Sequence, residues 1–163
     1  MKSEICCFTG HRKLPPKDLQ QIQTLLEREI NRLLAIGVRT FLAGGALGFD
    51  TLAAQTVLKL KEEDSPIQLV LVLPCRDQAS RWENDDRALY EQIKQGTDQV
   101  VYTAERYFPG CMHQRNRYLA DHSGWCLCWL TRETGGTAYT VRRCRAQEVR
   151  VINLAGKSFN NLK

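Results

Sequence analysis

The chain lacks a long apolar run, a paired-cysteine motif and both common nucleotide-binding signatures. No apolar stretch approaches the roughly 20 residues of a membrane span. The opening segment, MKSEICCFTGHRK, is too poor in apolar side chains to form a signal-peptide core. These absences predict a cytoplasmic protein without a membrane partner. Neither GxGxxG nor the phosphate-binding loop with its Lys and Ser/Thr occurs, so neither a dehydrogenase nor an ATPase is favoured.

The cysteines are arranged in a way that argues against disulfides and metal. The chain has seven of them, an odd number, and no CxxC pair or other zinc-type spacing occurs. We therefore expect buried free thiols in a reducing compartment and no bound metal. Cys126 and Cys128 alternate along an apolar run, so both should face the same side of one strand.

The length and composition are those of an ordinary globular domain with a mild positive charge. Hydrophobic residues make up 43% of the chain and charged residues 25%. A length of 163 residues predicts a single domain over residues 1–163, with a core at about 5–154 and a frayed tail at about 157–163. The formal net charge of +5 suits anionic ligands. A homo-oligomer is compatible with such a domain, although no stretch marks an interface.

Short apolar runs alternate with longer periodic segments along the whole chain. Several of the short runs are continuous, as in strands that are covered on both faces. The predicted strands are residues 5–8, 40–43, 68–73, 99–103, 124–130 and 149–154. The predicted helices are residues 17–36, 49–63, 79–95, 111–122 and 136–147. This alternation predicts an α/β fold, a Rossmann-like three-layer sandwich with a mostly parallel sheet of about six strands.

The turns that follow the strands should carry the chemistry. Right-handed crossovers place every such turn on one edge of the sheet, where α/β proteins bind their ligands. The first turn holds Thr9, Gly10 and Arg12, whose guanidinium suits a phosphate or carboxylate. His11 in the same turn is expected to be an ordinary loop residue.

The second turn, GGALGFD, contains Gly44, Gly45 and Gly48 and ends at Asp50. Its glycines permit positive φ and a close approach of the backbone, and the helix that follows offers free N–H groups to a phosphate. The same glycines also fit simple packing of strand on helix. Asp50 either caps the helix or accepts a hydrogen bond from a sugar hydroxyl.

Two further turns and one helix start complete the candidate set. In the third turn, Arg81 and Trp82 can stack on a base or form a lid, although a core tryptophan is equally compatible. The fourth turn is a second glycine-rich segment that opens a helix. Two glycine-rich turns on one edge favour a phosphate-bearing ligand more than either turn does alone. The remaining candidates for binding are Gly135, Gly136, Thr137, Arg115 and Asn116.

Four segments together resemble the SLOG superfamily: FTGHR, AGGALGFDTLAA, LPCRDQASRW and MHQRNRYLADHSGWCLCWLTRETGGTA. That superfamily includes the Lonely Guy phosphoribohydrolases, the DprA/Smf proteins and the YpsA-like proteins. The short chain and its LPCRDQASRW segment resemble the YpsA-like branch in particular. The resemblance covers about residues 5–154. It implies a Rossmann-like fold and a pocket for a nucleotide or nucleotide-derived ligand, with no further cofactor required.

The resemblance to the Lonely Guy enzymes is incomplete at their catalytic positions. Arg115 matches an arginine of their helix-start motif, whereas Gln114 and Asn116 replace its Glu and Lys. Alignment on Thr137 places the catalytic glutamate at Thr140, which cannot stabilise an oxocarbenium-like state as a carboxylate does. If the chain is a hydrolase, the candidate catalytic residues are Arg115, Glu133 and Asp50.

Three functions are therefore compatible with the sequence. The first is a sensor or regulator that binds a nucleotide or nucleotide-sugar through the glycine-rich turns. Replacing Gly45 by Val and Arg115 by Ala should abolish that binding and leave the fold intact. The second is an N-glycosidase of nucleoside monophosphates. The third is a DprA-like binder of single-stranded DNA, which would use a basic track with aromatic side chains.

Overall fold

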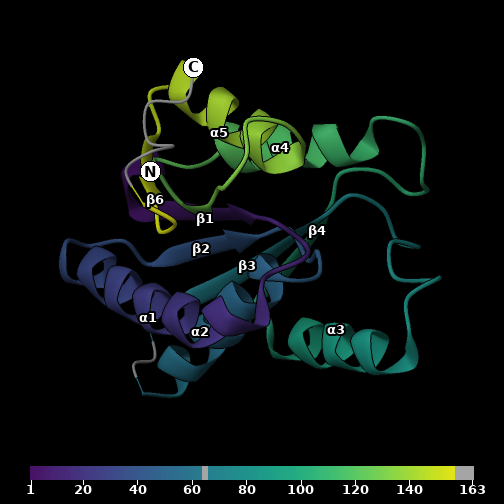
Figure 1. The fold of residues 1–163 in the computed structure, drawn as a ribbon, viewed down its shortest axis with the longest axis horizontal. Coiled ribbons are helices and arrows are strands. Elements are labelled where there is room, and N and C mark those ends of the chain that lie inside the picture. The colour runs from purple at the N-terminus through teal and green to yellow at the C-terminus, as the bar shows by residue number, and fades with distance from the viewer. Residues whose placement is uncertain (64–65, 157–163) are drawn as a thin grey trace.

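The computed structural model describes residues 1–63 and 66–156, which form one parallel six-stranded sheet between two layers of helices (Figure 1). The predicted tail at 157–163 lies outside the described residues. The strands are β1 (Ile5–Gly10), β2 (Thr40–Ala43), β3 (Gln68–Leu73), β4 (Gln99–Tyr102), β5 (Trp125–Trp129) and β6 (Arg150–Asn153). The helices are α1 (Leu19–Ala35), α2 (Phe49–Glu63), α3 (Asn84–Gly96), α4 (Cys111–Asp121) and α5 (Gly136–Ala146), with short 3-10 turns η1 (Lys2–Glu4) and η2 (Pro16–Asp18). The predicted α/β three-layer class is confirmed.

The strand order decides where a ligand can bind. The order is β4-β3-β2-β1-β5-β6, and every pair of neighbours is parallel. The chain steps outward from β1 to β4 and then returns to the other side of β1. Helices α1, α2 and α3 therefore cover one face, and α4 and α5 cover the other (Figure 1). The direction of winding reverses between β1 and β5, so this is the switch point at which such sheets bind ligands.

Each face of the sheet has its own apolar core. Phe8 of β1 packs beneath α1 and α2, with its ring stacked 5.8 Å from that of Phe41. The neighbouring Cys7 points to the opposite face, beneath α4 and α5, because successive strand residues alternate. Cys126 and Cys128 belong to this second core, which confirms that they share one side of their strand. All seven cysteines are buried and free.

Helix α3 begins later than its apolar pattern predicts. The pattern places its start near residue 79, but residues 77–82 form successive turns and the helix begins at Asn84. The turns bring Trp82 back against α3, where its ring lies 5.2 Å from that of Tyr90 in an edge-to-face contact. This tertiary contact replaces the first helical turn that local periodicity predicts.

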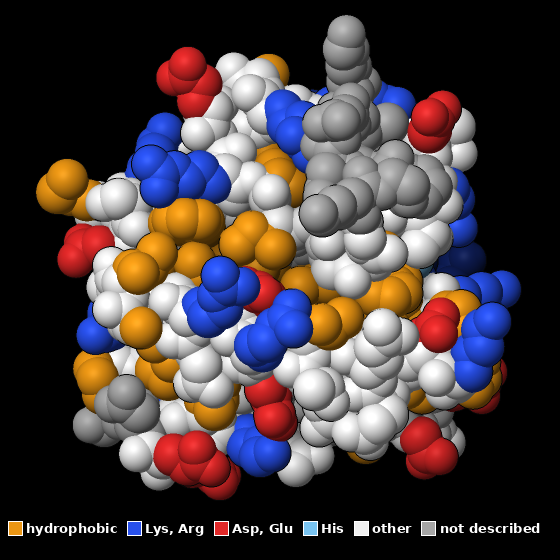
Figure 2. All heavy atoms as spheres, turned by 60° about the vertical axis from the view of Figure 1, so that its left-hand side comes forward, with side chains coloured by type: hydrophobic (Ala, Val, Ile, Leu, Met, Phe, Trp, Pro, Cys, Tyr) orange, Lys and Arg blue, Asp and Glu red, His pale blue; other side chains and the backbone are white. Residues whose placement is uncertain are grey.

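The surface carries charges of both signs. Figure 2 shows the side that lies to the left in Figure 1, and there Lys, Arg, Asp and Glu side chains are interspersed with apolar ones. This mixture is typical of protein surfaces and does not form a continuous basic track on this face. Within the described residues, no helix combines the length and the hydrophobicity that crossing a bilayer requires.

Candidate functional site

A cavity of about 190 Å³ lies at the reversal between β1 and β5, and we call it the switch-point cavity. It is formed by the end of β1, the turns after β1, β2, β3 and β5, the first turns of α2 and α5, and one side of α4. Its lining residues are Phe8, Thr9, Gly10, His11, Arg12, Ala46, Asp50, Gln78, Met112, Arg115, Asn116, Leu119, Arg132, Gly136 and Thr137. Strands far apart in the sequence thus bring one set of polar groups to a single point.

Most of the candidate residues from the sequence meet in this cavity. Those that line it are Thr9, Gly10, Arg12, Asp50, Arg115, Asn116, Gly136 and Thr137. Gly45 and Gly48 line an adjoining cavity of about 440 Å³, and Arg81 and Trp82 line a third of about 390 Å³. Gly44 lies behind Arg115, and Gly135 immediately precedes α5. Arg12 lines all three cavities, so they open onto a common region.

Arg115 is the buried cation of the site. It lies in α4 with a residue exposure of only 6%. Its Nη1 donates to the carbonyl oxygen of Gly44, and its Nε donates to Oδ1 of Asn116 at 2.8 Å. Burial lowers the pKa of Arg115, and the charge of Asp50 opposes that effect. A guanidinium held in this way presents a fixed positive charge beside the cavity.

Asp50 lies in the first turn of α2 and is equally buried. Its Oδ2 accepts a hydrogen bond from the N–H of Ala46 at 3.3 Å, so it binds the preceding turn. Its Oδ1 is buried without a hydrogen-bond partner in the part of the chain that the structure describes. Burial raises the pKa of Asp50 to about 6, against the opposing effect of Arg115. A ligand hydroxyl or amine would satisfy this oxygen.

The glycines of the second turn serve its backbone geometry. Gly48 has a φ of +80°, and a Cβ there would overlap the carbonyl oxygen of Arg12. Gly45 has a φ of +72°, and a Cβ there would overlap the side chain of Leu73. We therefore expect Gly45→Val with Arg115→Ala to strain the second turn in addition to removing groups of the site. Both changes affect positions that hold the site together.

His11 is a site residue that the sequence interpretation missed. It is buried, with an exposure of 5%, and its Nε2 accepts the N–H of Thr131 at 2.9 Å. A backbone N–H can only donate, so this imidazole nitrogen carries no proton. Burial, and then the charge of Arg132, lower the pKa of His11. Its place directly after β1 was the one signal that could have identified it, because the turn after β1 lies at the ligand edge.

We expect the hydrogen bond between His11 and Thr131 to make stability depend on pH. The pKa of His11 is depressed in the folded state, so its contribution is complete above the ordinary value of 6.5 and is lost as pH falls. The variant His11→Gln keeps an acceptor but cannot titrate. Urea unfolding of both proteins from pH 8 to pH 5 should show the wild type losing stability relative to the variant below about pH 6.5. Asp50 titrates equally in both proteins, so it cannot cause a difference between them. Parallel curves of stability against pH would therefore contradict this role of His11.

Glu133, the remaining catalytic candidate, does not line the cavity, and neither does Thr140. Thr140, at the position of the Lonely Guy glutamate, is fully buried and its hydroxyl donates to the carbonyl oxygen of Gly136 at 2.8 Å. Glu133 is exposed, and its carbonyl oxygen accepts a hydrogen bond from Arg142. Asp50 is thus the only carboxylate among the residues that line the switch-point cavity.

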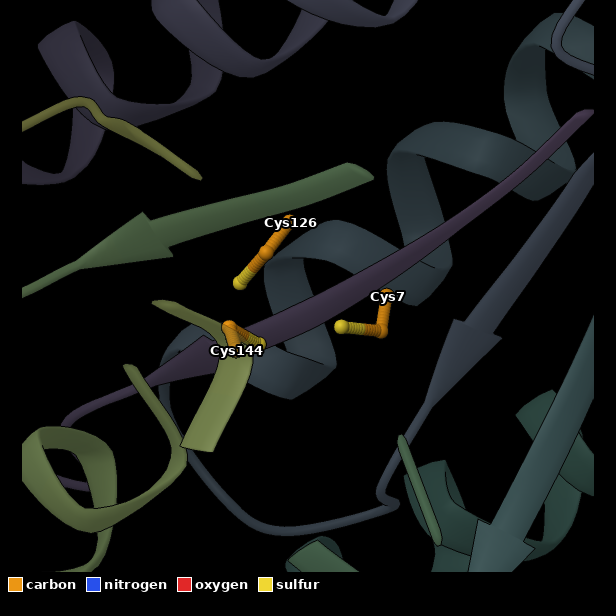
Figure 3. A group of neighbouring side chains, drawn as sticks. All are labelled: Cys7, Cys126 and Cys144. Atoms are coloured by element: carbon orange, nitrogen blue, oxygen red, sulfur yellow. The ribbon is translucent and has the colours of Figure 1, made fainter. Parts of the chain in front are cut away.

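A second group of reactive side chains lies in the core beneath α5. The sulfur atoms of Cys7, Cys126 and Cys144 point toward one another (Figure 3) and all lie within 4.8 Å of each other. They come from β1, β5 and α5, so sequence spacing could not have revealed the group. Three thiols in this arrangement could hold a thiophilic metal ion.

The fold and the site together define a class of protein. A parallel sheet whose winding reverses at β1 and β5, with glycine-rich turns around a polar cavity at that point, is a doubly wound Rossmann-like domain. Within this class the chain belongs to the YspA SLOG family, whose model (YpsA) matches residues 3–153. The resemblance that the sequence motifs indicate is therefore confirmed.

Relatives of this chain occur in several bacteria. It is 30% identical over 123 residues to the UPF0398 protein BH1768 of Halalkalibacterium halodurans, which covers 74% of this chain and 65% of that protein. It is 28% identical over 123 residues to the uncharacterized SPbeta prophage-derived protein YoqJ of Bacillus subtilis, covering 68% of each. The chain thus matches somewhat less than two thirds of the length of BH1768.

Two solved structures share the fold. DNA processing protein A (DprA) of Streptococcus pneumoniae superposes with a TM-score of 0.69 at 17% identity, over 96% of this chain and 52% of that one. DNA processing protein A of Helicobacter pylori superposes with a TM-score of 0.65 at 17% identity, over 92% of this chain and 64% of that one. At this level of identity the likeness shows a common fold.

Proposed function

We propose that this chain binds a nucleotide or nucleotide-sugar at the switch-point cavity and acts as a sensor or regulator. The observation that carries the proposal is the buried Oδ1 of Asp50, which lacks a partner among the described residues and lies in the wall of that cavity. Buried polar atoms are almost always hydrogen-bonded in folded proteins. A ribose hydroxyl would supply the missing donor.

Positive groups on the other walls support a phosphate in the same ligand. Arg115 is buried and fixed, whereas Arg12 is exposed at the point where the cavities meet. Helix α5 begins at Gly136 without a side-chain cap, and Gly136 and Thr137 line the cavity. Uncapped N–H groups and the positive end of a helix dipole bind phosphate. The carboxylate of Asp50 is thus suited to the ribose hydroxyls of a nucleotide, and the cationic groups are suited to its phosphate.

The proposal is tested by thermal unfolding of the protein with a panel of ligands. The panel contains ribose 5-phosphate, nucleoside mono- and diphosphates, ADP-ribose, NAD and a short single-stranded oligonucleotide. A ligand at about 100 times its Kd stabilises by roughly 2.7 kcal/mol, which for a domain of this size raises Tm by about 5–10 °C. If none of the phosphate compounds raises Tm, the proposal is wrong.

Two matched variants locate the binding. Arg12→Gln removes an exposed cation at the cavity, so it should keep the Tm of the free protein and lose most of the ligand-induced shift. Lys2→Gln removes the same charge before β1, at the opposite edge of the sheet, and should change neither quantity. An equal shift in wild type and Arg12→Gln would place the ligand elsewhere.

Asp50 also favours a second candidate function, hydrolysis of an N-glycosidic bond. It is the carboxylate in the cavity, and its pKa of about 6 lets it exchange a proton near neutral pH. Incubation with each monophosphate of the panel, followed by chromatography, would show free base if this activity exists. Release that stops in Asp50→Asn would support it, and absence of release from every bound monophosphate would reject it.

A third candidate is single-stranded DNA, which the DNA processing protein A of Helicobacter pylori binds. The 390 Å³ cavity favours it, because Arg12, Arg81, Trp82 and Tyr107 provide cations and aromatic rings at one place. A Tm shift with the oligonucleotide alone, weakening steeply with salt, would support this function. Absence of that shift would reject it.

A further inference from the structure

The cavity of about 440 Å³ beside the switch-point cavity has a different chemical character. It lies between α2, α3 and the turn after β2, and we call it the α2–α3 cavity. Its walls are largely apolar and include Leu52, Leu89 and Ile93. Trp82 and Tyr90 also line it, in the edge-to-face pair described above. A concave, apolar and aromatic site of this size is typical of small-molecule binding.

The two cavities are continuous. Arg12, Ala46 and Asp50 line both of them, so the side chain of Asp50 stands at the boundary. Arg115 and Arg132 line the switch-point cavity alone, and Arg12 and Asp50 line both cavities. Leu52, Leu89 and Ile93 line the α2–α3 cavity but not the switch-point cavity. A nucleotide has the same order of chemistry, in its phosphate, its ribose and its base.

We propose that the α2–α3 cavity is the subsite for the base of the bound nucleotide, with the ribose at Asp50 and the phosphate in the switch-point cavity. This inference rests on the proposed function and adds to it the part of the ligand that determines specificity. Apolar walls exclude water from an aromatic base, and the ring of Trp82 or Tyr90 offers a stacking surface. A ligand that lacks a base should therefore bind more weakly than a complete nucleotide.

The test compares ribose 5-phosphate with AMP, GMP, CMP and UMP by calorimetric titration. At least one nucleotide should bind the wild type about ten-fold or more tightly than ribose 5-phosphate, the scale of one stacked base. Leu89→Trp fills the cavity from α3, so it should lower the affinity for that nucleotide to the level of ribose 5-phosphate. The affinity for ribose 5-phosphate itself should stay unchanged.

Controls keep this inference separate from the proposed function. Ala88→Trp adds the same side chain at an exposed position of α3 outside the α2–α3 cavity and should change neither affinity. Leu52→Trp fills the cavity from α2 and replaces Leu89→Trp if that variant does not fold. If ribose 5-phosphate binds but no nucleotide binds more tightly, or if the filled variants keep full nucleotide affinity, the base subsite is wrong and the phosphate site stands. If no compound binds, both proposals are wrong.

Discussion

Replacing Arg115 by methionine is expected to lower the free energy of unfolding by about 1–3 kcal/mol at neutral pH, the usual effect of leaving a buried polar group without its hydrogen-bond partner. Methionine approximates the length of the arginine side chain but provides no charge and no donor. The carbonyl oxygen of Gly44 would lose the hydrogen bond from Nη1, and Asp50 would lose the positive charge that lowers its pKa. Urea unfolding followed by circular dichroism measures the change.

The pH dependence of this loss identifies its cause. The pKa of Asp50 is already raised to about 6, and without Arg115 it should rise further. The variant should therefore keep losing stability as pH rises above 6, where the wild type has stopped doing so. The matched control is Arg117→Met, because Arg117 lies in the same helix, is exposed and donates to the Tyr139 hydroxyl at 3.0 Å. If both variants lose equally little, Arg115 has no structural role at the site.

Asp50→Asn is expected to have the opposite effect on stability and to weaken ligand binding. A pKa raised from 3.8 to about 6 corresponds to roughly 3 kcal/mol that the folded state loses when this carboxyl ionises. Below pH 3.8 the carboxyl of Asp50 is neutral in both the folded and the unfolded state, and it costs no stability. Stability is then lost as pH rises through 6. Asparagine resembles the neutral carboxyl and can still accept the N–H of Ala46. The variant should therefore gain up to about 3 kcal/mol at pH 8 and almost nothing at pH 4.

Thermal unfolding across this pH range measures the gain, and Asp121→Asn provides a control of opposite sign. The ion pair with Arg143 lowers the pKa of Asp121, so its replacement should cost a little stability at pH 8. A Tm of Asp50→Asn equal to or below that of the wild type at pH 8 would show that the carboxylate is not destabilising. If Asp50→Asn gains stability but loses ligand binding, the carboxylate of Asp50 serves the ligand and lowers the stability of the fold.

The two substitutions should also interact. The double variant has neither a buried carboxylate nor a buried guanidinium. Its loss of unfolding free energy should therefore be smaller than the sum of the changes measured for Arg115→Met and Asp50→Asn separately. Residues that share one buried electrostatic environment usually couple by 0.5–3 kcal/mol, on the order of what a double-mutant cycle resolves. Strict additivity would mean that Asp50 and Arg115 act independently.

Local pattern in the sequence was sufficient for the architecture. The ranges 40–43 and 68–73 are the bounds of β2 and β3, because their apolar runs are continuous and are followed by Gly44 and Pro74. Right-handed crossovers then required the turns to lie on one edge, and Arg12, Asp50 and Thr137 do meet there. The start of α3 was missed because the contact between Trp82 and Tyr90 is tertiary.

The sequence by itself determined the fold class, the edge of the sheet that carries the site and most of the residues around the cavity. Only the tertiary structure decided what those residues do, because their environments come from contacts between distant segments. Arg115 reaches Gly44 across 71 positions, and Thr131 reaches His11 across 120. Burial of Asp50, the convergence of Cys7, Cys126 and Cys144, and the apolar cavity between α2 and α3 arise in the same way. Periodicity reports which face of an element is apolar, whereas desolvation, pKa and cavity shape depend on which elements pack together.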